Sequence, residues 1–334
     1  MAFVVDGSDW KLNGKSATQV EAAIEQFLGA LGDANDAEIP VWFSENFQAD
    51  PVLGNQIILE LMGPGSPLQL PTELWQELAA YLGRPRHYIE DERQPQGFPI
   101  HFDIAIDGGM PEPNPDVAWA HHSVREGRAV ACIGLWRTGV FSTSSAVATE
   151  SLHWVGDSRS VAEFWREGID IEGNTLAAFE RFAARAYPEL YFCGNVLHHA
   201  GDFVGGYHAN AANLKRHLAV LNDYGHWAFT AAPPAQDPTD PPGTAGNLPP
   251  DQLVQARFAR KQVDIAPEHA NVKSNKTCRE AREVALGGGQ VLYCEWHCKL
   301  QGHQNRIHLH RPVTESNDKL VVAIFAQHLP LPGD

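Results

Sequence analysis

Three segments close to the end of the chain carry the alternating apolar and polar pattern that is typical of β-strands. In residues 291–300 apolar, aromatic or thiol side chains occupy every even position, and in residues 306–310 Ile307 and Leu309 alternate with charged and imidazole side chains. Successive side chains of a strand point to opposite faces, so each segment is predicted to bury one face only. A third segment, residues 319–327, is apolar on both faces and is predicted to be a central strand or a strand with both faces covered by other elements.

Short connections indicate how these strands pair. Residues 287–290 and 312–318 have the length that joins neighbouring antiparallel strands, so we expect a mainly antiparallel sheet at the end of the chain. Its buried face is expected to hold Trp296 together with four apolar side chains, Leu292, Leu300, Ile307 and Leu309.

Upstream of this sheet, helical and strand patterns are mixed, which predicts an α/β (α+β) protein. A helix is predicted over residues 18–31, where Thr18 and Glu21 form a capping box and an apolar stripe follows. Further helices are predicted at residues 72–82, 160–165, 174–186, 213–224 and 251–260. Further strands are predicted at residues 3–5, 40–43, 56–62, 100–106, 128–136, 150–155 and 190–193.

Two stretches break this pattern and predict domain boundaries. Residues 90–97 are polar and contain proline, and residues 231–250 hold seven prolines in twenty positions without periodicity. A proline-rich run of this kind is typical of a semi-rigid linker. The predicted organisation is therefore a mixed α/β unit over residues 1–97, a second over residues 98–230, a linker at 231–250 and a sheet domain over 251–334.

Length and composition place the chain among ordinary globular proteins. Its 334 residues exceed one average domain, and no stretch reaches the roughly 18 apolar residues of a membrane span. The first ten residues carry two aspartates where a secretory signal would be basic and then apolar. Five scattered cysteines do not resemble a disulfide framework. These features predict a cytoplasmic protein without a membrane partner.

Charge is distributed unevenly along the chain. The formal net charge is −16, but residues 251–334 contain 11 Lys and Arg against 9 Asp and Glu, whereas residues 1–250 contain 14 against 32. Such asymmetry favours a C-terminal segment that faces an anionic partner. The alternative is that acidic surfaces simply keep a cytosolic protein in solution.

The predicted outer face of the C-terminal sheet combines the groups that RNA cleavage without a metal requires. A base must take the proton of a ribose 2′-hydroxyl, an acid must protonate the leaving oxygen, and a cation must stabilise charge on phosphorus. Histidine, with an unperturbed pKa of about 6.5, can perform either proton transfer near neutral pH. The residues predicted to share this face are Glu295, His297, Lys299, Arg306, His308 and His310.

Other interpretations of the same residues remain open. His308 and His310 would lie roughly 6.6–6.8 Å apart along a strand, which is compatible with a divalent metal, and His297 or Glu295 is the candidate third ligand. A second alternative is that the face is a solvated surface that happens to be rich in histidine. A third is that it binds nucleic acid or a protein and catalyses no reaction.

The runs YCEWHCKL, NRIH and KLVVAIFAQHL in residues 251–329 resemble the C-terminal part of bacterial proteins with a W-H-x-K-L then R-I-H signature. More distantly they resemble the messenger-RNA interferase toxins of the RelE/HigB type. The resemblance implies a toxin or a stress- or phage-defence-associated ribonuclease that acts on RNA, with a ribosome, a cognate antitoxin or a defence protein as partner, and without a cofactor.

The resemblance also assigns roles to individual residues. It implies that Lys299 and Arg306 face phosphate and that His297, His308 and His310 are acid–base candidates. It adds the late His328 to the acid–base and substrate-binding candidates. The basic run over residues 271–282 contributes Lys276 and Arg282 as further substrate-binding candidates.

Overall fold

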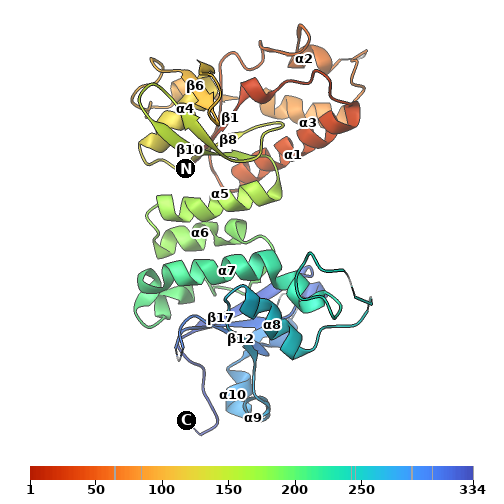
Figure 1. Cartoon of the computed structure of the whole chain (residues 1–334), viewed down its shortest axis with the longest axis vertical. Coiled ribbons are helices and arrows are strands. Elements are labelled where there is room, and N and C mark those ends of the chain that lie inside the picture. The colour runs from red at the N-terminus through yellow and green to blue at the C-terminus, as the bar shows by residue number, and fades with distance from the viewer. Residues whose placement is uncertain are drawn as a thin grey trace. The chain divides into compact units, whose positions relative to one another are not determined.

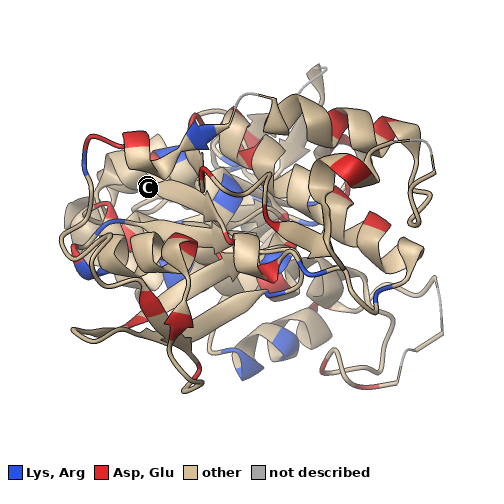
Figure 2. Ribbon diagram, turned by 90° about the horizontal axis from the view of Figure 1, so that it is seen from above, with Lys and Arg blue, Asp and Glu red and all other residues tan. Residues whose placement is uncertain are grey.

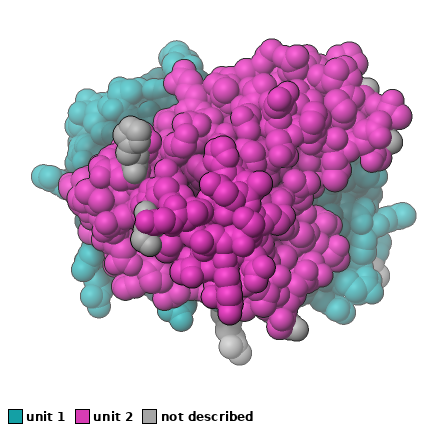
Figure 3. Space-filling view, turned by 90° about the horizontal axis from the view of Figure 1, so that it is seen from below, with its two compact units in different colours: residues 1–172 teal, residues 173–334 magenta. Residues whose placement is uncertain are grey.

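The protein is described here by a computed structural model that covers residues 1–63, 65–83, 85–241, 243–244, 246–286, 289–302 and 304–333 (Figure 1). The chain divides into two compact units, residues Met1–Glu172 and Gly173–Asp334 (Figure 3). None of the described helices combines enough length with enough apolar character to serve as a transmembrane span.

Unit 1 contains a mixed sheet and helices on both of its faces. Its helices are α1 (Ala17–Asp36), α2 (Ile58–Leu61), α3 (Thr72–Leu82), α4 (Pro115–Arg125) and α5 (Ser158–Ile171). Its strands are β1 (Ala2–Val5), β2 (Val41–Phe43), β3 (Pro51–Leu53), β4 (Gln56–Ile57), β5 (Arg86–His87), β6 (Asp103–Ile106), β7 (Glu112–Pro113), β8 (Val130–Ile133), β9 (Gly139–Ser144) and β10 (Thr149–Val155).

The eight-stranded sheet of unit 1 has the order β5-β2-β1-β8-β10-β9-β6-β7. Its first five strands are parallel neighbours, and the remainder pair antiparallel. From β1 the chain moves to β2 and β5 on one side and later to β8 on the other. The carboxyl ends of β1 and β8 therefore form a topological switch point, where open parallel sheets commonly bind ligands.

Strand β1 shows why this sheet is covered on both faces. Phe3 packs against Phe164 of α5 with tilted rings, whereas Val4 packs with Trp119 of α4 on the opposite face. All four residues of β1 are buried, as expected for a parallel strand between two helical layers.

Helix α1 begins earlier than the sequence pattern predicts. Ser16 accepts a hydrogen bond from the Gln19 amide, and the Gln19 side chain accepts one from the Ser16 amide. This capping box replaces the predicted pair of Thr18 and Glu21, because Ser-x-x-Gln satisfies the same end-group donors two residues upstream. The predicted strand at 56–62 is also corrected, since only β4 is extended there and α2 follows directly.

Unit 2 contains a five-stranded sheet with the order β11-β17-β16-β15-β12. Its helices are α6 (Leu176–Ala186), α7 (Gly206–Thr230), α8 (Asp251–Arg260), α9 (Ala270–Ser274) and α10 (Lys276–Glu280). Its strands are β11 (Leu190–Phe192), β12 (Ile265–Pro267), β13 (Glu283–Ala285), β14 (Val291–Tyr293), β15 (Trp296–Lys299), β16 (Arg306–His310) and β17 (Leu320–Ala326).

The C-terminal sheet is mainly antiparallel, as predicted, and only the pair of β11 and β17 is parallel. Helices α7 and α8 lie beside β17 and β12 (Figure 1). Trp296 is 1% exposed and meets Phe229 of α7 edge to face, with ring centroids 5.2 Å apart. Its predicted neighbours are buried as well, so the assignment of the inner face is confirmed; they are Leu292, Leu300, Ile307 and Leu309.

The predicted strand at 291–300 is divided into two. Strand β14 pairs with β13 in a separate two-stranded sheet, and β15 enters the five-stranded sheet after a break at residues 294–295. The division changes the position of Glu295, which no longer continues the face of β15. In the predicted connection at 287–290, Gly287 and Gly288 lie outside the described residues.

The structure draws the division of the chain elsewhere than the sequence predicts. The sheet of unit 1 uses strands from both sides of residues 90–97, and β11 joins the C-terminal sheet from before the proline-rich segment. Residues 231–250 lie within unit 2, where the buried Arg257 donates to the carbonyls of Ala231 and Ala235. Long-range strand pairing, which local composition does not reveal, sets these boundaries.

The two units also separate the charge of the chain. Unit 1 contains 26 Asp and Glu against 10 Lys and Arg, and unit 2 contains 15 of each. Figure 2 marks these acidic and basic positions along the ribbon. The excess of negative charge therefore belongs to unit 1.

Candidate functional site

The pairing of β15 with β16 brings four of the predicted site residues onto one face. His297 lies opposite His308, and Lys299 lies opposite Arg306, in an antiparallel register. Directly opposed side chains in such a pair point to the same side of the sheet. The two histidines have ring centroids 5.9 Å apart. This part of the face was predicted from the alternation of the two strands.

A carboxylate that the sequence analysis missed lies at the centre of this face. Glu268 follows β12, the edge strand that pairs with β15, and its amide donates to the Glu295 carbonyl at 2.7 Å. Oε1 of Glu268 lies 3.1 Å from Nε of Arg282, 3.1 Å from Nδ1 of His297 and 3.5 Å from Nδ1 of His308. Three side chains thus converge on a single oxygen atom.

This cluster is removed from solvent. The side chains of Arg282 and His308 are 0% exposed, that of Glu268 is 5% exposed, and that of His297 is 10% exposed. Arg282 also donates to the carbonyls of Cys278 at 2.9 Å and Pro330 at 3.1 Å. A buried guanidinium needs a negative partner, and Glu268 supplies it.

Burial and charge act on the pKa values in opposite directions here. Burial alone would raise the pKa of Glu268, but contact with His297 and His308 and the charge of Arg282 together hold it well below its usual range. Burial lowers the pKa of His308 to about 4, although Glu268 counteracts this. Near neutral pH His308 is therefore uncharged, and the charge of Glu268 is balanced by Arg282.

His297 is the member of the cluster with access to the outside. Its Nδ1 faces Glu268, which leaves Nε2 as the ring nitrogen available for a further contact. Nδ1 of His297 and Oε1 of Glu268 are close enough for an ion pair, but neither atom has a partner in hydrogen-bond geometry among the described residues.

The remaining predicted acid–base residues lie apart from this cluster. Glu295 accepts from Nε of Arg311 at 2.7 Å, so its predicted place beside the histidines is corrected. Nδ1 of His310 lies 2.8 Å from the Arg311 carbonyl. His328 is exposed and follows the end of β17.

The predicted substrate-binding cations have different environments. Lys299 forms an ion pair with Asp264 at 3.1 Å, and Lys276 approaches Glu280 at 3.8 Å on an exposed surface. Arg282 was predicted to contact substrate, but it is fully buried and holds Glu268 instead. Arg306 is partly buried, and its Nε has no hydrogen-bond partner among the described residues.

Among the residues that the structure describes, no group of three or more His, Cys, Asp or Glu side chains is placed to hold a metal ion. The alternative with a divalent metal at His308 and His310 stays a prediction.

A second group of carboxylates, of which Asp6 and Asp116 are buried, lies at the switch point of unit 1 and was also missed. Asp6 follows β1 and accepts from Nη1 of Arg137 and Nε1 of Trp154, both at 2.9 Å. Asp9 accepts from the amides of residues 135, 136 and 137 at 2.7–2.9 Å. Three successive amides form a concavity that binds anions, and here the chain's own carboxylate occupies it.

Asp116 completes this group from the first turn of α4. Its Oδ2 accepts from the Gly7 amide at 2.9 Å, and the residue is 5% exposed. Burial raises the pKa of Asp116 to about 7; the Gly7 amide opposes this rise, whereas the charge of Asp6 adds to it. Carboxylates with raised pKa values at a switch point are typical of ligand sites, but they also occur where side chains only hold neighbouring loops together.

A signal was present in the sequence for the group in unit 1, but not for the one around Glu268. Asp6 directly follows an apolar strand, as ligand-facing residues in parallel sheets do, and Asp9 comes three residues later. Glu268 follows a proline after a short extended segment, but nothing local connects it to Arg282 or His297. Only strand pairing brings these residues together.

Comparison with family models, with curated proteins and with solved structures gave no match to this chain. The resemblance to interferase toxins therefore rests on the short sequence motifs alone.

Proposed function

We propose that the C-terminal sheet cleaves RNA without a metal ion, in the manner of a bacterial toxin or defence-associated ribonuclease. The observation that supports this proposal is the 3.1 Å contact between Oε1 of Glu268 and Nδ1 of His297, on the face that also carries Lys299 and Arg306. An imidazole and a cation are two of the groups that phosphodiester transfer requires, and a general acid is the third.

In the proposed reaction Nε2 of His297 takes the proton of a ribose 2′-hydroxyl. The 2′-oxygen then bonds to the adjacent phosphorus, and the bond from phosphorus to the 5′-oxygen breaks. The leaving 5′-oxygen receives a proton from a general acid, for which His310 at the end of β16 is the candidate. The products are a cyclic phosphate and a free 5′-hydroxyl, and no further reactant is consumed.

Arg306 is the proposed phosphate ligand. Its Nε has no hydrogen-bond partner among the described residues, whereas Lys299 is engaged with Asp264. A guanidinium can bind two phosphate oxygens at once and does not lose its charge at physiological pH. Lys299 lies opposite Arg306 in the strand pair, but its charge is balanced by Asp264.

The structure changes the role that the sequence suggests for His308. Its ring is fully buried and its pKa is lowered to about 4, so it cannot exchange protons with a substrate near neutral pH. His308 packs against His297 and is assigned to positioning that ring.

The test is the cleavage of an end-labelled RNA by the full chain, with binding followed separately by fluorescence anisotropy. The His297→Ala substitution is expected to lower turnover by roughly 10²–10⁴-fold and to leave binding largely intact. The Arg306→Ala substitution is expected to weaken binding and cleavage together. His226→Ala, on an exposed position of α7, is the matched control and is expected to change neither.

Three results would redirect the proposal. Unchanged cleavage by the His297→Ala protein would remove this residue from the mechanism. Activity that a chelator abolishes and zinc or manganese restores would favour the metal alternative at His308 and His310. Binding without cleavage, also in the presence of ribosomes, would favour a non-catalytic nucleic-acid-binding module.

A further inference from the structure

A buried histidine of unit 1, which the proposed RNA cleavage does not use, contacts two hydroxyl groups. His121 lies on α4 and is 0% exposed. Its Nδ1 lies 2.9 Å from Oγ1 of Thr143 on β9, and its Nε2 lies 3.0 Å from Oγ of Ser145, which directly follows β9. The three side chains meet because β9 pairs with β10, the strand against which α4 packs.

The hydrogen bonds around His121 indicate which ring nitrogen carries the proton. Thr143 donates its hydroxyl proton to the Glu150 carbonyl at 3.3 Å, so its oxygen accepts from Nδ1–H of His121. Nε2 is then unprotonated and accepts the hydroxyl proton of Ser145. The other acceptor within reach of this hydroxyl, the Ala148 carbonyl, is farther away at 3.4 Å. A hydroxyl that donates to an imidazole held by a third group is the arrangement of an activated nucleophile.

The surroundings of the network favour removal of the serine proton. Burial, with a smaller effect from His122 and Arg125, lowers the pKa of His121 to about 4, so the ring is neutral near neutral pH and can accept a proton. The amides of residues 147 and 148 donate to Oγ of Ser145 at 3.3 and 3.2 Å and stabilise the charge that develops there. A base of low pKa has little driving force for proton transfer, so we expect a slow reaction.

The oxygen of Ser145 lies at the end of the sheet where apolar side chains are exposed. Ser145 itself is half-buried. Val147 in the same turn is 49% exposed, and Phe102 is 41% exposed. Phe102 directly precedes β6, which runs antiparallel to β9 with Ala105 opposite Ser144, so the start of β6 and the end of β9 share one end of the sheet. Apolar groups of a substrate are favoured beside such side chains.

We propose that Ser145 is a nucleophile for acyl transfer, with His121 as its base, Thr143 as the residue that positions the imidazole, and esters of small apolar acids as the substrate class. Nε2 of His121 takes the hydroxyl proton, Oγ bonds to the carbonyl carbon of the ester, and the alcohol leaves with the proton from Nε2. Water then reacts with the acyl-serine by the same route, which releases the carboxylic acid and restores Ser145. This activity does not depend on the RNA cleavage proposed for the C-terminal sheet.

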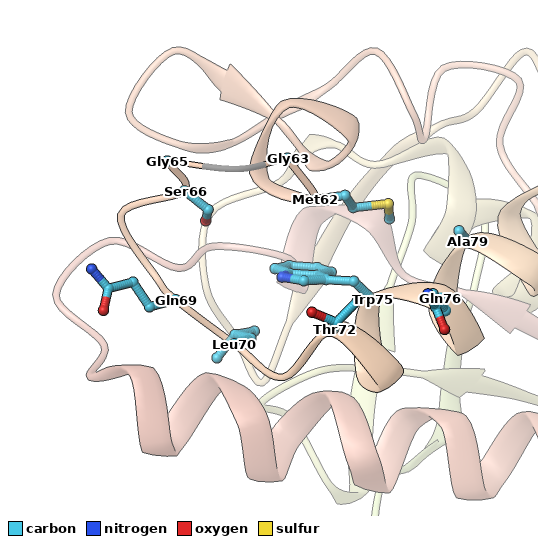
Figure 4. Close-up of a pocket in the computed structure, with 10 residues that line it drawn as sticks. All are labelled: Met62, Gly63, Gly65, Ser66, Gln69, Leu70, Thr72, Trp75, Gln76 and Ala79. Atoms are coloured by element: carbon cyan, nitrogen blue, oxygen red, sulfur yellow. The ribbon is translucent and has the colours of Figure 1, made fainter.

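The chain contains a second serine that serves as an internal reference. Ser66 is half-buried like Ser145, and its oxygen also accepts from the amide two residues later, that of Leu68, at 3.3 Å. It lines a cavity of about 730 Å³ beside α3, whose described lining contains no histidine or carboxylate (Figure 4). Ser66 therefore has a similar backbone contact without a base.

The experiment is the reaction of the full chain with an alkyl fluorophosphonate, followed by peptide mass spectrometry. The phosphorus of this probe bonds to a serine oxygen and fluoride leaves. We expect label on Ser145 and none on Ser66, and slow hydrolysis of p-nitrophenyl butyrate that Ser145→Ala abolishes. His121→Gln is expected to lower the rate of labelling by roughly 10²–10⁴-fold.

Two substitutions of Thr143 separate positioning from packing. Thr143→Val keeps the shape of the side chain but removes the acceptor for Nδ1–H, and it is expected to lower the rate of labelling about 10-fold, as the loss of one hydrogen bond predicts. Thr143→Ser keeps the hydroxyl and is expected to keep most of the rate. Near-ultraviolet circular dichroism checks that each variant is folded.

Several results would overturn the proposal. One is the absence of label on Ser145 at millimolar probe, and another is equal labelling of Ser145 and Ser66. A third is labelling that Thr143→Val and a folded His121→Gln protein leave unchanged. Ester hydrolysis that is absent in the wild type, or that persists in the Ser145→Ala protein, would equally remove the acyl-transfer assignment.

Discussion

Replacing Glu268 by glutamine removes the negative charge at the centre of the C-terminal sheet and keeps the shape of the side chain. Arg282 then loses its counter-ion while it stays fully buried, because its two carbonyl acceptors, Cys278 and Pro330, carry no net charge. Removal of one partner of a buried ion pair costs about 3–5 kcal/mol. About 1.4 kcal/mol corresponds to a factor of ten in an equilibrium constant. The equilibrium constant for local unfolding of the C-terminal sheet is therefore expected to rise roughly 100-fold to 5,000-fold.

Hydrogen exchange measured by mass spectrometry can locate this effect. Peptides that cover β15, β16 and β17 are expected to exchange faster in the Glu268→Gln protein by that factor, whereas peptides of unit 1 are expected to be unchanged. Glu295→Gln is the matched control: it removes the same charge from a pair with Arg311 that is about one-third exposed on both sides. Pairs of this kind contribute only about 0–1 kcal/mol.

The pH dependence of the stability difference between wild type and Glu268→Gln is a second test of the ion pair. The pKa of Glu268 lies below its usual range, so its contribution to stability is present above the pKa of the unfolded chain, about 4.3, and is lost as the pH falls below that value. The difference between wild type and Glu268→Gln should therefore be constant near neutral pH and shrink in acid. Equal exchange of the two proteins at pH 7 would refute the assignment of Glu268 as the partner of Arg282.

Three other predictions concern stability. Trp296→Ala truncates a fully buried core side chain, and its free energy of unfolding in urea should fall by about 3–5 kcal/mol; an unchanged value would mean that the inner and outer faces are interchanged. The pKa of Asp116 is raised to about 7, so the folded state keeps a proton that the unfolded state releases above about pH 4. Wild-type stability should therefore decline between pH 4 and pH 7 by at most about 4 kcal/mol, and Asp116→Asn should flatten this decline in calorimetry. Arg257→Met removes the donor to the carbonyls of Ala228, Ala231 and Ala235; limited proteolysis within residues 231–250 should accelerate, and an unchanged cleavage rate would show that this segment is held by other contacts.

The sequence by itself determined those features that depend on near neighbours in the chain. Alternation along residues 296–299 and 306–310 was enough to assign Trp296 to the core and to place His297, Lys299, Arg306 and His308 on one face. The reason is that a strand turns its side chains by half a revolution at every residue, whatever it pairs with. The mainly antiparallel sheet followed from the short connections, because a short connection joins neighbouring strands that run in opposite directions.

Only the tertiary structure decided what these side chains meet. Glu268 reaches His297 because β12 pairs with β15, and Arg282 reaches Glu268 from a separate segment. Pairing between distant strands is set by the packing of the whole unit, so no local pattern distinguishes Glu268 from the neighbouring Glu295, which lies beside Arg311 instead. Burial likewise removes His308, an acid–base candidate in the sequence, from solvent and lowers its pKa, because the cost of charging a group depends on the solvent that the complete fold excludes.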